Sequence, residues 1–265
     1  MANALTIPDG DALPDRALLY AESCFETFRV IDGAILGEER HWHRLLAGMA
    51  SFGIELDEVQ LRALFAEAKS RAARMAPDML VRLTVGGGHA TWGVQPPVDR
   101  QCEAIIHLLP PPQRTAPMIA QSMAWPFSLE HKNAKFPADY ARLLQAMQQW
   151  RQLGIWLPGA EPILHRDGYL ISAATANLLI KRDGHWWTPQ GKGVLPGVVR
   201  SLLLESGAVR ASACPQRWLA EAEALAICNS GLFLRPLASL DGRELATTEL
   251  SELWKILHAF AGVGR

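Results

Sequence analysis

The residue with the clearest chemical potential is Lys132, which lies in residues 128–137, after a short apolar run and before an amphipathic helix pattern. A lysine amine in its neutral form attacks carbonyl carbons and forms a Schiff base. Most lysines are solvated surface charges, and the local sequence alone favours that role for Lys132. The candidate residues on either side of it must therefore decide between the two roles.

A second candidate is a turn that precedes a helix. Residues 193–200 contain Gly197 and lead into an apolar helix predicted at residues 201–205. The first N–H groups of a helix have no intrahelical partner, and the helix dipole favours negative charge, so such a turn is suited to a phosphate. Many helices begin in this way without binding an ion. The glycine triplet 86–88 is a weaker phosphate signal, and we expect a flexible loop there.

Metal binding is not indicated. His41 and His43 are two residues apart on a predicted helix and point to different faces. The four cysteines contain no C-x-x-C pair, so the sequence predicts neither a zinc site nor a disulfide framework. We expect reduced thiols.

Composition narrows the class of protein. The chain has 265 residues, a formal net charge of -1 and 49% hydrophobic residues, which is typical of a globular protein with room for two modest domains. No run of Lys and Arg is present, which argues against nucleic acid as a partner. The N-terminal residues 1–11 lack the features of a leader, and no stretch is long and apolar enough for a membrane span, so we expect a soluble, cytoplasmic protein.

The first half of the chain alternates strand and helix patterns. Residues 25–31 predict a strand that turns at Asp32-Gly33 into a return strand at 34–36. Helix patterns follow at 38–52 and 57–75, and strand patterns at 79–85 and 102–109.

The second half begins after the proline-rich segment 110–117, where we place the domain boundary. A strand at 118–125 and a helix that starts at Pro137 precede short strands joined by Asp-Gly turns, which predict a mostly antiparallel sheet. These strands are expected at 162–165, 168–180, 185–187 and 224–228, with a hairpin at 241–242 and a last helix at 248–261. The predicted class is α/β (α+β): a smaller N-terminal α/β domain (1–109), a linker (110–117) and a larger, mostly antiparallel β domain with helices (118–265).

Several short motifs, in this order, resemble those of the fold-type IV pyridoxal-phosphate enzymes, the class IV aminotransferase superfamily. The motifs are Asp15-Arg16, Cys24-Phe25-Glu26-Thr27, residues 29–33, His41-x-x-Arg44-Leu45, Leu195-Pro196-Gly197-Val198-Val199-Arg200, and Cys228-Asn229-Ser230 with Arg235-Pro236-Leu237. The opening motifs are most similar to aminodeoxychorismate lyases. No single motif is specific, but the ordered set extends over nearly the whole chain.

The resemblance implies a two-domain fold, pyridoxal 5'-phosphate (PLP) as cofactor, and a homodimer. It implies that Lys132 forms the Schiff base with the cofactor; Lys135 is the alternative, because the following residues do not match the family's usual K-x-x-N-Y pattern. It also implies that the cofactor phosphate is held by Arg44, Gly197, the backbone N–H groups of Val198 and Val199, and Ser230.

The sequence departs from the family pattern at Ser172. The family's E-x-x-x-x-N motif is represented by residues 172–177, with Asn177 retained and Ser172 in place of the glutamate that pairs with the pyridine nitrogen. A hydroxyl leaves that nitrogen largely neutral, whereas a carboxylate keeps it protonated. A neutral ring weakens transamination more than an elimination with a good leaving group, so Ser172 favours a lyase.

A second departure lies after the glycine-rich loop. Relatives often carry R-G-Y there, with the arginine available to a substrate carboxylate, whereas this chain has Trp92-Gly93-Val94. Arg82 or Arg29 are the possible replacements, and Thr27 is a candidate to orient substrate, although each is also an ordinary strand residue.

The sequence therefore predicts a PLP-dependent lyase that converts 4-amino-4-deoxychorismate to 4-aminobenzoate and pyruvate, for folate synthesis. The first alternative is a branched-chain or D-amino-acid aminotransferase of the same fold. The second is a descendant of the fold that no longer catalyses and serves as a binding or scaffold protein.

Overall fold

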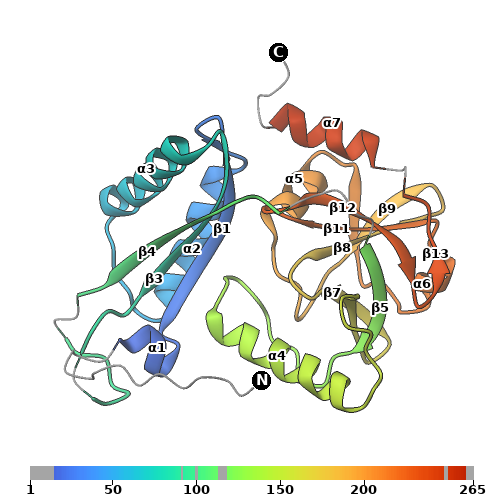
Figure 1. The fold of residues 1–265 in the computed structure, drawn as a ribbon, viewed down its shortest axis with the longest axis horizontal. Coiled ribbons are helices and arrows are strands. Elements are labelled where there is room, and N and C mark those ends of the chain that lie inside the picture. The colour runs from blue at the N-terminus through green and yellow to red at the C-terminus, as the bar shows by residue number, and fades with distance from the viewer. Residues whose placement is uncertain (1–14, 91, 99–100, 113–117, 248–249, 261–265) are drawn as a thin grey trace, which may run out of the picture.

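A computed structural model gives the structure of residues 15–90, 92–98, 101–112, 118–247 and 250–260, and Figure 1 shows two β-sheets with helices around them. The smaller sheet has the order β2-β1-β3-β4, and the larger has the order β10-β9-β8-β11-β12-β5-β6-β7 with β13 on β12. The smaller sheet contains β1 (Ser23–Ile31), β2 (Ala34–Ile35), β3 (Asp78–Gly86) and β4 (Glu103–Leu109). The larger contains β5 (Met118–Ala124), β6 (Glu161–Arg166), β7 (Tyr169–Ala173), β8 (Asn177–Arg182), β9 (His185–Pro189), β10 (Val209–Ser212), β11 (Ala224–Asn229), β12 (Phe233–Leu240) and β13 (Arg243–Glu244).

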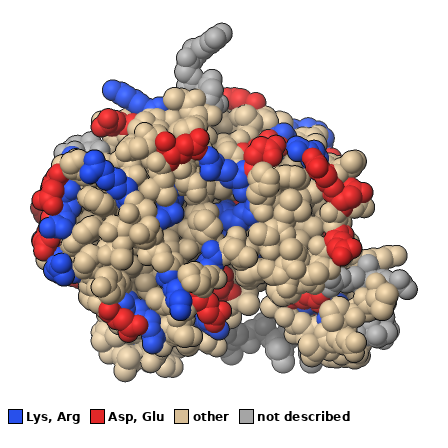
Figure 2. All heavy atoms as spheres, turned by 180° about the vertical axis from the view of Figure 1, so that it is seen from behind, with Lys and Arg blue, Asp and Glu red and all other residues tan. Residues whose placement is uncertain are grey.

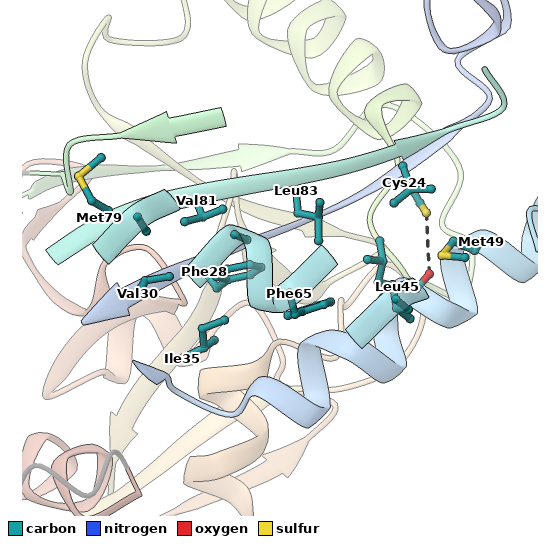
Figure 3. Packing of buried hydrophobic residues seen from close by; sticks show 14 of the residues in the cluster. Cys24, Phe28, Val30, Ile35, Leu45, Met49, Phe65, Met79, Val81 and Leu83 are labelled. Carbon is teal, nitrogen blue, oxygen red and sulfur yellow. Dashed lines mark hydrogen bonds between the residues drawn. The ribbon is translucent and has the colours of Figure 1, made fainter. Parts of the chain in front are cut away.

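The helices of the described residues are α1 (Arg16–Tyr20), α2 (Glu38–Ser51), α3 (Glu58–Met75), α4 (Pro137–Gln152), α5 (Val198–Glu205), α6 (Trp218–Glu221) and α7 (Ser251–Phe260). Helices α2 and α3 cover one face of the smaller sheet (Figure 1). Their apolar side chains meet alternate residues of β1, such as Phe28 and Val30, in the core drawn in Figure 3. In this core the Cys24 thiol donates to the Leu45 carbonyl.

Local sequence signals explain where several elements begin and end. The N-cap of α3 is Asp57, which forms a capping box with Gln60. The hairpin between β1 and β2 turns at Asp32 (φ 48°) and Gly33 (φ 79°), so both central residues have the positive φ of a type I′ turn. Three further Asp-Gly pairs among the described residues, at 167–168, 183–184 and 241–242, also have positive φ at both residues, which confirms the predicted hairpin turns.

The larger sheet is mostly antiparallel, as predicted. Five of its eight strand pairings are antiparallel, and three are parallel: β5 with β6, β5 with β12, and β9 with β10. The strand expected at 168–180 is two strands, because the Ala174 N–H donates to the Glu161 carboxylate instead of continuing the ladder. Helix α5 begins at Val198, three residues earlier than predicted, and its first turn is closed by Ser201 N–H on the Gly197 carbonyl.

The two sheets divide the chain close to the predicted boundary. The smaller uses strands between residues 23 and 109, and the larger uses strands between residues 118 and 244. Residues 113–117 of the expected linker and both ends of the expected last helix, 248 and 261, lie outside the described residues. The division into domains stays a prediction.

Helix α4 packs against both sheets. It lies below and between them in the view of Figure 1, and Pro137 occupies its first turn as predicted. Just before it, the Lys135 carbonyl accepts a hydrogen bond of 3.1 Å from Phe25 N–H in β1. The rings of Phe25 and Tyr140 stack with centroids 5.6 Å apart. The segment around Lys132 and Lys135 is therefore fixed against the smaller sheet.

The surface carries both signs of charge. On the face shown in Figure 2, basic and acidic side chains are interspersed, and a few basic side chains lie near its centre. In the part of the chain that the structure describes, no helix has both the length and the apolar character that a membrane span requires. The four cysteines are free thiols.

Candidate active site

A cleft of about 210 Å³ lies where α4, the turn before α5 and the ends of β7 and β11 meet the first strand of the smaller sheet. It brings together residues that are distant in sequence, among them many of the predicted site residues. Those that line it are Arg44, Lys132, Lys135, Ser172, Asn177, Gly197, Val198 and Ser230. Val199 is buried behind this lining, on the first turn of α5.

The two candidate lysines occupy different parts of the cleft. Lys135 is half-buried and lines the cleft, with its Nζ 5.6 Å from the centroid of the Phe25 ring. Burial lowers the pKa of its amine from 10.5 to about 8; Glu26 opposes this change, whereas Arg44 and Arg82 add to it. Lys132 is one third exposed, and its Nζ lies 3.6 Å from Oδ1 of Asp139. The neutral amine that nucleophilic chemistry needs is thus favoured at Lys135.

Arg44 is held by a buried carboxylate. Glu26, on the helix-facing side of β1, accepts hydrogen bonds from Nε and Nη2 of Arg44 at 2.6 and 2.7 Å. Nη1 of Arg44 donates to the carbonyl of Pro196 at 2.9 Å. Arg44 therefore joins the smaller sheet to the turn before α5, and two of its five N–H groups, one on each terminal nitrogen, remain for a ligand in the cleft.

His41 completes this cluster. Its Nδ1 lies 2.6 Å from Oε2 of Glu26. Burial would raise the pKa of Glu26, but hydrogen bonds from Arg44 and His41 outweigh it and lower that pKa to about 2. Burial also lowers the pKa of His41, against the pull of Glu26, so the imidazole is neutral and donates its Nδ1–H to the carboxylate. Among the described residues nothing bonds to its Nε2.

The start of α5 is shaped for close approach by an anion. Gly197 is the N-cap and provides no side-chain hydrogen bond to the first N–H groups of the helix, those of Val198 and Val199. A Cβ at Gly197 would lie 1.9 Å from Oδ1 of Asn177, so this position requires glycine. Asn177 Nδ2 in turn donates to the Leu195 carbonyl at 2.9 Å and holds the turn in place.

Ser172 and Ser230 also line the cleft. Ser172 is half-buried on β7, and Ser230 is 7% exposed at the end of β11. Between β7 and β8 the chain is fixed by Glu161, whose Oε1 accepts from Ala174 N–H at 3.0 Å. Burial raises the pKa of Glu161, and the N–H groups of this loop oppose that rise.

The four substrate candidates lie outside the lining of the cleft. Trp92 is 78% exposed, and Arg29 is bound by Asp78, with Nε to Oδ1 at 2.8 Å. Thr27 pairs with Arg82 across β1 and β3. The guanidinium of Arg82 lies 3.7 Å from the centroid of the Phe25 ring, which does line the cleft, so Arg82 packs directly against a residue of the lining.

Sequence reasoning missed the role of Glu26, although a signal was present. Glu26 stands on a strand face that otherwise carries apolar core residues such as Cys24 and Phe28, and a carboxylate on such a face needs a partner. Tyr140 and Trp125, which also line the cleft, gave no comparable signal. No group of three or more potential metal ligands occurs among the described residues.

Comparisons with known proteins give a family match and similar folds. Residues 23–240 match the family model described as Amino-transferase class IV. No curated protein sequence matches the chain.

Three solved structures illustrate the likeness in fold. A hypothetical aminotransferase from Mycobacterium tuberculosis in a PLP-bound form has a TM-score of 0.78 at 19% identity, covering 100% of this chain and 96% of the other. The 4-amino-4-deoxychorismate lyase from Pseudomonas aeruginosa has a TM-score of 0.74 at 24% identity, covering 98% and 96%. The branched-chain amino acid aminotransferase from Escherichia coli has a TM-score of 0.75 at 22% identity, covering 94% and 87%.

Proposed function

The chain belongs to the class IV aminotransferases, a family of PLP-dependent enzymes, and from this premise we propose that it is a lyase that converts 4-amino-4-deoxychorismate to 4-aminobenzoate and pyruvate. The observation that carries the choice of lyase is Ser172, a hydroxyl that lines the cleft at the position where the family pattern has a glutamate. When bound, PLP supplies an electron-withdrawing pyridine ring. A serine beside that ring cannot keep its nitrogen protonated as a carboxylate does, and elimination tolerates this loss better than transamination.

The residues of the cleft fit the phosphate of PLP. A phosphate needs donors and positive charge, and the start of α5 offers the N–H groups of Val198 and Val199 beside a glycine that admits close approach. Arg44 adds the two N–H groups that are not bonded to Glu26 or Pro196, and Ser230 adds a hydroxyl. We propose that these four residues hold the phosphate.

We propose Lys135, the alternative in the sequence, as the lysine that attaches the cofactor. Its pKa of about 8 makes a substantial fraction of the amine neutral near physiological pH, as a nucleophile requires. The Nζ of Lys132 lies instead 3.6 Å from Oδ1 of Asp139, on helix α4. Once released from the cofactor, Lys135 is the base and acid placed to move protons at the substrate carbons.

Arg82 is the residue best placed to meet a carboxylate of the substrate. No carboxylate among the described residues pairs with it, whereas Arg29 is held by Asp78. Arg82 packs on Phe25, next to Tyr140 and Lys135, which line the cleft. A substrate that reaches Lys135 therefore approaches this guanidinium.

A homodimer in the cytoplasm is part of the proposal. The face of the smaller sheet opposite α2 and α3 carries Ile105 and Leu109, which are 46% and 47% exposed, and a second subunit would cover such apolar side chains. Light scattering coupled to gel filtration checks the mass in solution, and a monomer at micromolar concentration contradicts this part of the proposal.

Two experiments test the function. Pyruvate release from 4-amino-4-deoxychorismate is compared with amino transfer from branched-chain and D-amino acids; dominant amino transfer overturns the lyase and supports the aminotransferase alternative.

Borohydride reduction of the PLP-loaded protein, followed by peptide mass spectrometry, identifies the modified lysine. We expect the label on Lys135, and a label on Lys132 overturns that assignment. Failure to take up PLP supports a descendant that does not catalyse.

A further inference from the structure

Two cations at the mouth of the cleft have no role in the proposed cofactor site. Lys132 lies near Asp139, with Nζ 3.6 Å from Oδ1, and its side chain is 33% exposed. Arg142, three residues after Asp139 on α4, has its Nη1 3.2 Å from Oε1 of Glu130, and its side chain is 46% exposed. Lys132 and Arg142 both line the cleft that holds Lys135.

These ion pairs are weak and leave the cations available. Exposed pairs contribute about 0–1 kcal/mol, and the contact of Lys132 with Asp139 is longer than a hydrogen bond. The lining of the cleft carries four Lys and Arg side chains, namely Arg44, Lys132, Lys135 and Arg142, and two acids, Glu130 and Asp139. The excess of positive charge favours an anionic ligand. The carboxylate of such a ligand would take the place of Asp139 or Glu130 as the ion-pair partner of Lys132 or Arg142.

The interior of the cleft supplies the other requirements for such a ligand. Lys135 lies against the smaller sheet, with its Nζ 5.6 Å from the centroid of the Phe25 ring, whereas Lys132 lies near Asp139 on α4. Trp125, Leu164 and Ile171 provide an apolar wall in the same cleft. A flat ring fits against such a wall, and a substituent on the far side of the ring from the amine points away from Lys135, towards solvent.

We infer that Lys132 and Arg142 form a carboxylate subsite at the mouth of the cleft, which receives the ring carboxylate lying opposite the amine of the substrate. This inference rests on the proposed function, because it places the substrate amine at the cofactor held by Lys135. It assigns to Lys132 the recognition of the substrate in place of attachment of the cofactor. Selectivity then favours amines that carry an acid across the ring over neutral amines of the same shape.

The test measures binding of two ligands to the PLP-loaded protein by isothermal titration calorimetry. The ligands are 4-aminobenzoate and its neutral counterpart 4-aminobenzamide. We expect the wild type to bind the acid about 5–10-fold more tightly, the range that one charge-assisted contact supplies. Lys132→Met removes most of this preference, and Lys132→Arg retains it. Lys255→Met, at an exposed position on α7, is the matched control and leaves the preference unchanged.

The outcomes separate this inference from the proposed function. A preference that survives in Lys132→Met, a wild type without any preference, or a wild type that binds neither ligand overturns the subsite. If the wild type releases no pyruvate from 4-amino-4-deoxychorismate, yet the preference exists and depends on Lys132, the lyase proposal fails and the subsite stands. If Lys132→Met loses covalently bound PLP while Lys135→Ala retains it, Lys132 is the attachment lysine and the subsite is wrong.

Discussion

Glu26 and Arg44 form a bidentate ion pair, with Nε to Oε1 at 2.6 Å and Nη2 to Oε2 at 2.7 Å, in which the carboxylate is 0% exposed. The pair fixes the plane of the guanidinium, so that the N–H groups not bound to Glu26 are oriented by the protein before any ligand arrives. It connects β1 with α2, and through the Pro196 carbonyl with the turn before α5. The position of the proposed phosphate site therefore depends on a residue that does not line the cleft.

The first prediction concerns stability. Glu26→Gln leaves the Arg44 charge buried without a compensating carboxylate, and breaking a buried pair in this way costs about 3–5 kcal/mol of unfolding free energy. Urea unfolding followed by circular dichroism measures the loss. Arg44→Met alone and the double variant complete the cycle, and the double variant should be more stable than the sum of the two losses predicts. Simple additivity would contradict the proposed coupling.

Hairpin turns and the starts of α3 and α4 were predictable because their signals are local, whereas the start of α5 was placed three residues too late. Asp32-Gly33 and the three later Asp-Gly pairs that the structure describes have positive φ at both residues, and the capping box of Asp57 with Gln60 marks the start of α3. Parallel pairing of β5 with β6 depends on long-range contacts, for which the short apolar runs of these strands contain no signal.

The site was predictable as a set of motifs, but not in its details. Lys132 and Lys135 are three residues apart but have different surroundings. The Lys135 carbonyl accepts a hydrogen bond from Phe25 N–H, more than one hundred residues earlier in the chain, and this contact holds Lys135 against the smaller sheet. Arg44 lines the cleft, and its ion pair with Glu26 follows from the packing of α2 on β1. Tertiary contacts of this kind leave no periodic pattern in the sequence.

The second prediction is a pH dependence. The neutral amine is the nucleophile, and burial lowers the pKa of Lys135 from 10.5 to about 8. The rate of PLP attachment to the apoprotein should therefore rise with pH up to about 8 and then level off, whereas an ordinary lysine would continue to gain rate up to 10.5. Stopped-flow absorbance measures this rate. Because the charge of Glu26 raises the pKa of Lys135, Glu26→Gln should move the midpoint of this pH–rate curve to lower pH. An unchanged midpoint argues against an electrostatic interaction between Glu26 and Lys135.

The third prediction concerns the close approach at Gly197. Gly197→Ala would place a Cβ 1.9 Å from Oδ1 of Asn177, which must move and release the Leu195 carbonyl. We expect the affinity for PLP to fall by about tenfold or more, because the N–H groups at the start of α5 shift with this turn. Equilibrium dialysis measures the affinity. The double variant Gly197→Ala with Asn177→Gly removes the clash and should recover part of the loss; equal losses in both variants would indicate another cause.

The last prediction concerns the balance between elimination and amino transfer. Ser172→Glu places a carboxylate in the wall of the cleft where the family pattern has one. A carboxylate there keeps the pyridine nitrogen of PLP protonated and strengthens electron withdrawal, so amino transfer from common amino acids should rise by about tenfold or more relative to pyruvate release. The ratio of the two rates, measured on the same preparation, checks this. Ser172→Gln has nearly the same size without the charge and should leave the ratio close to that of the wild type. If the glutamine variant raises amino transfer as much as the glutamate variant does, side-chain size and not charge controls the reaction, and Ser172 no longer supports the lyase.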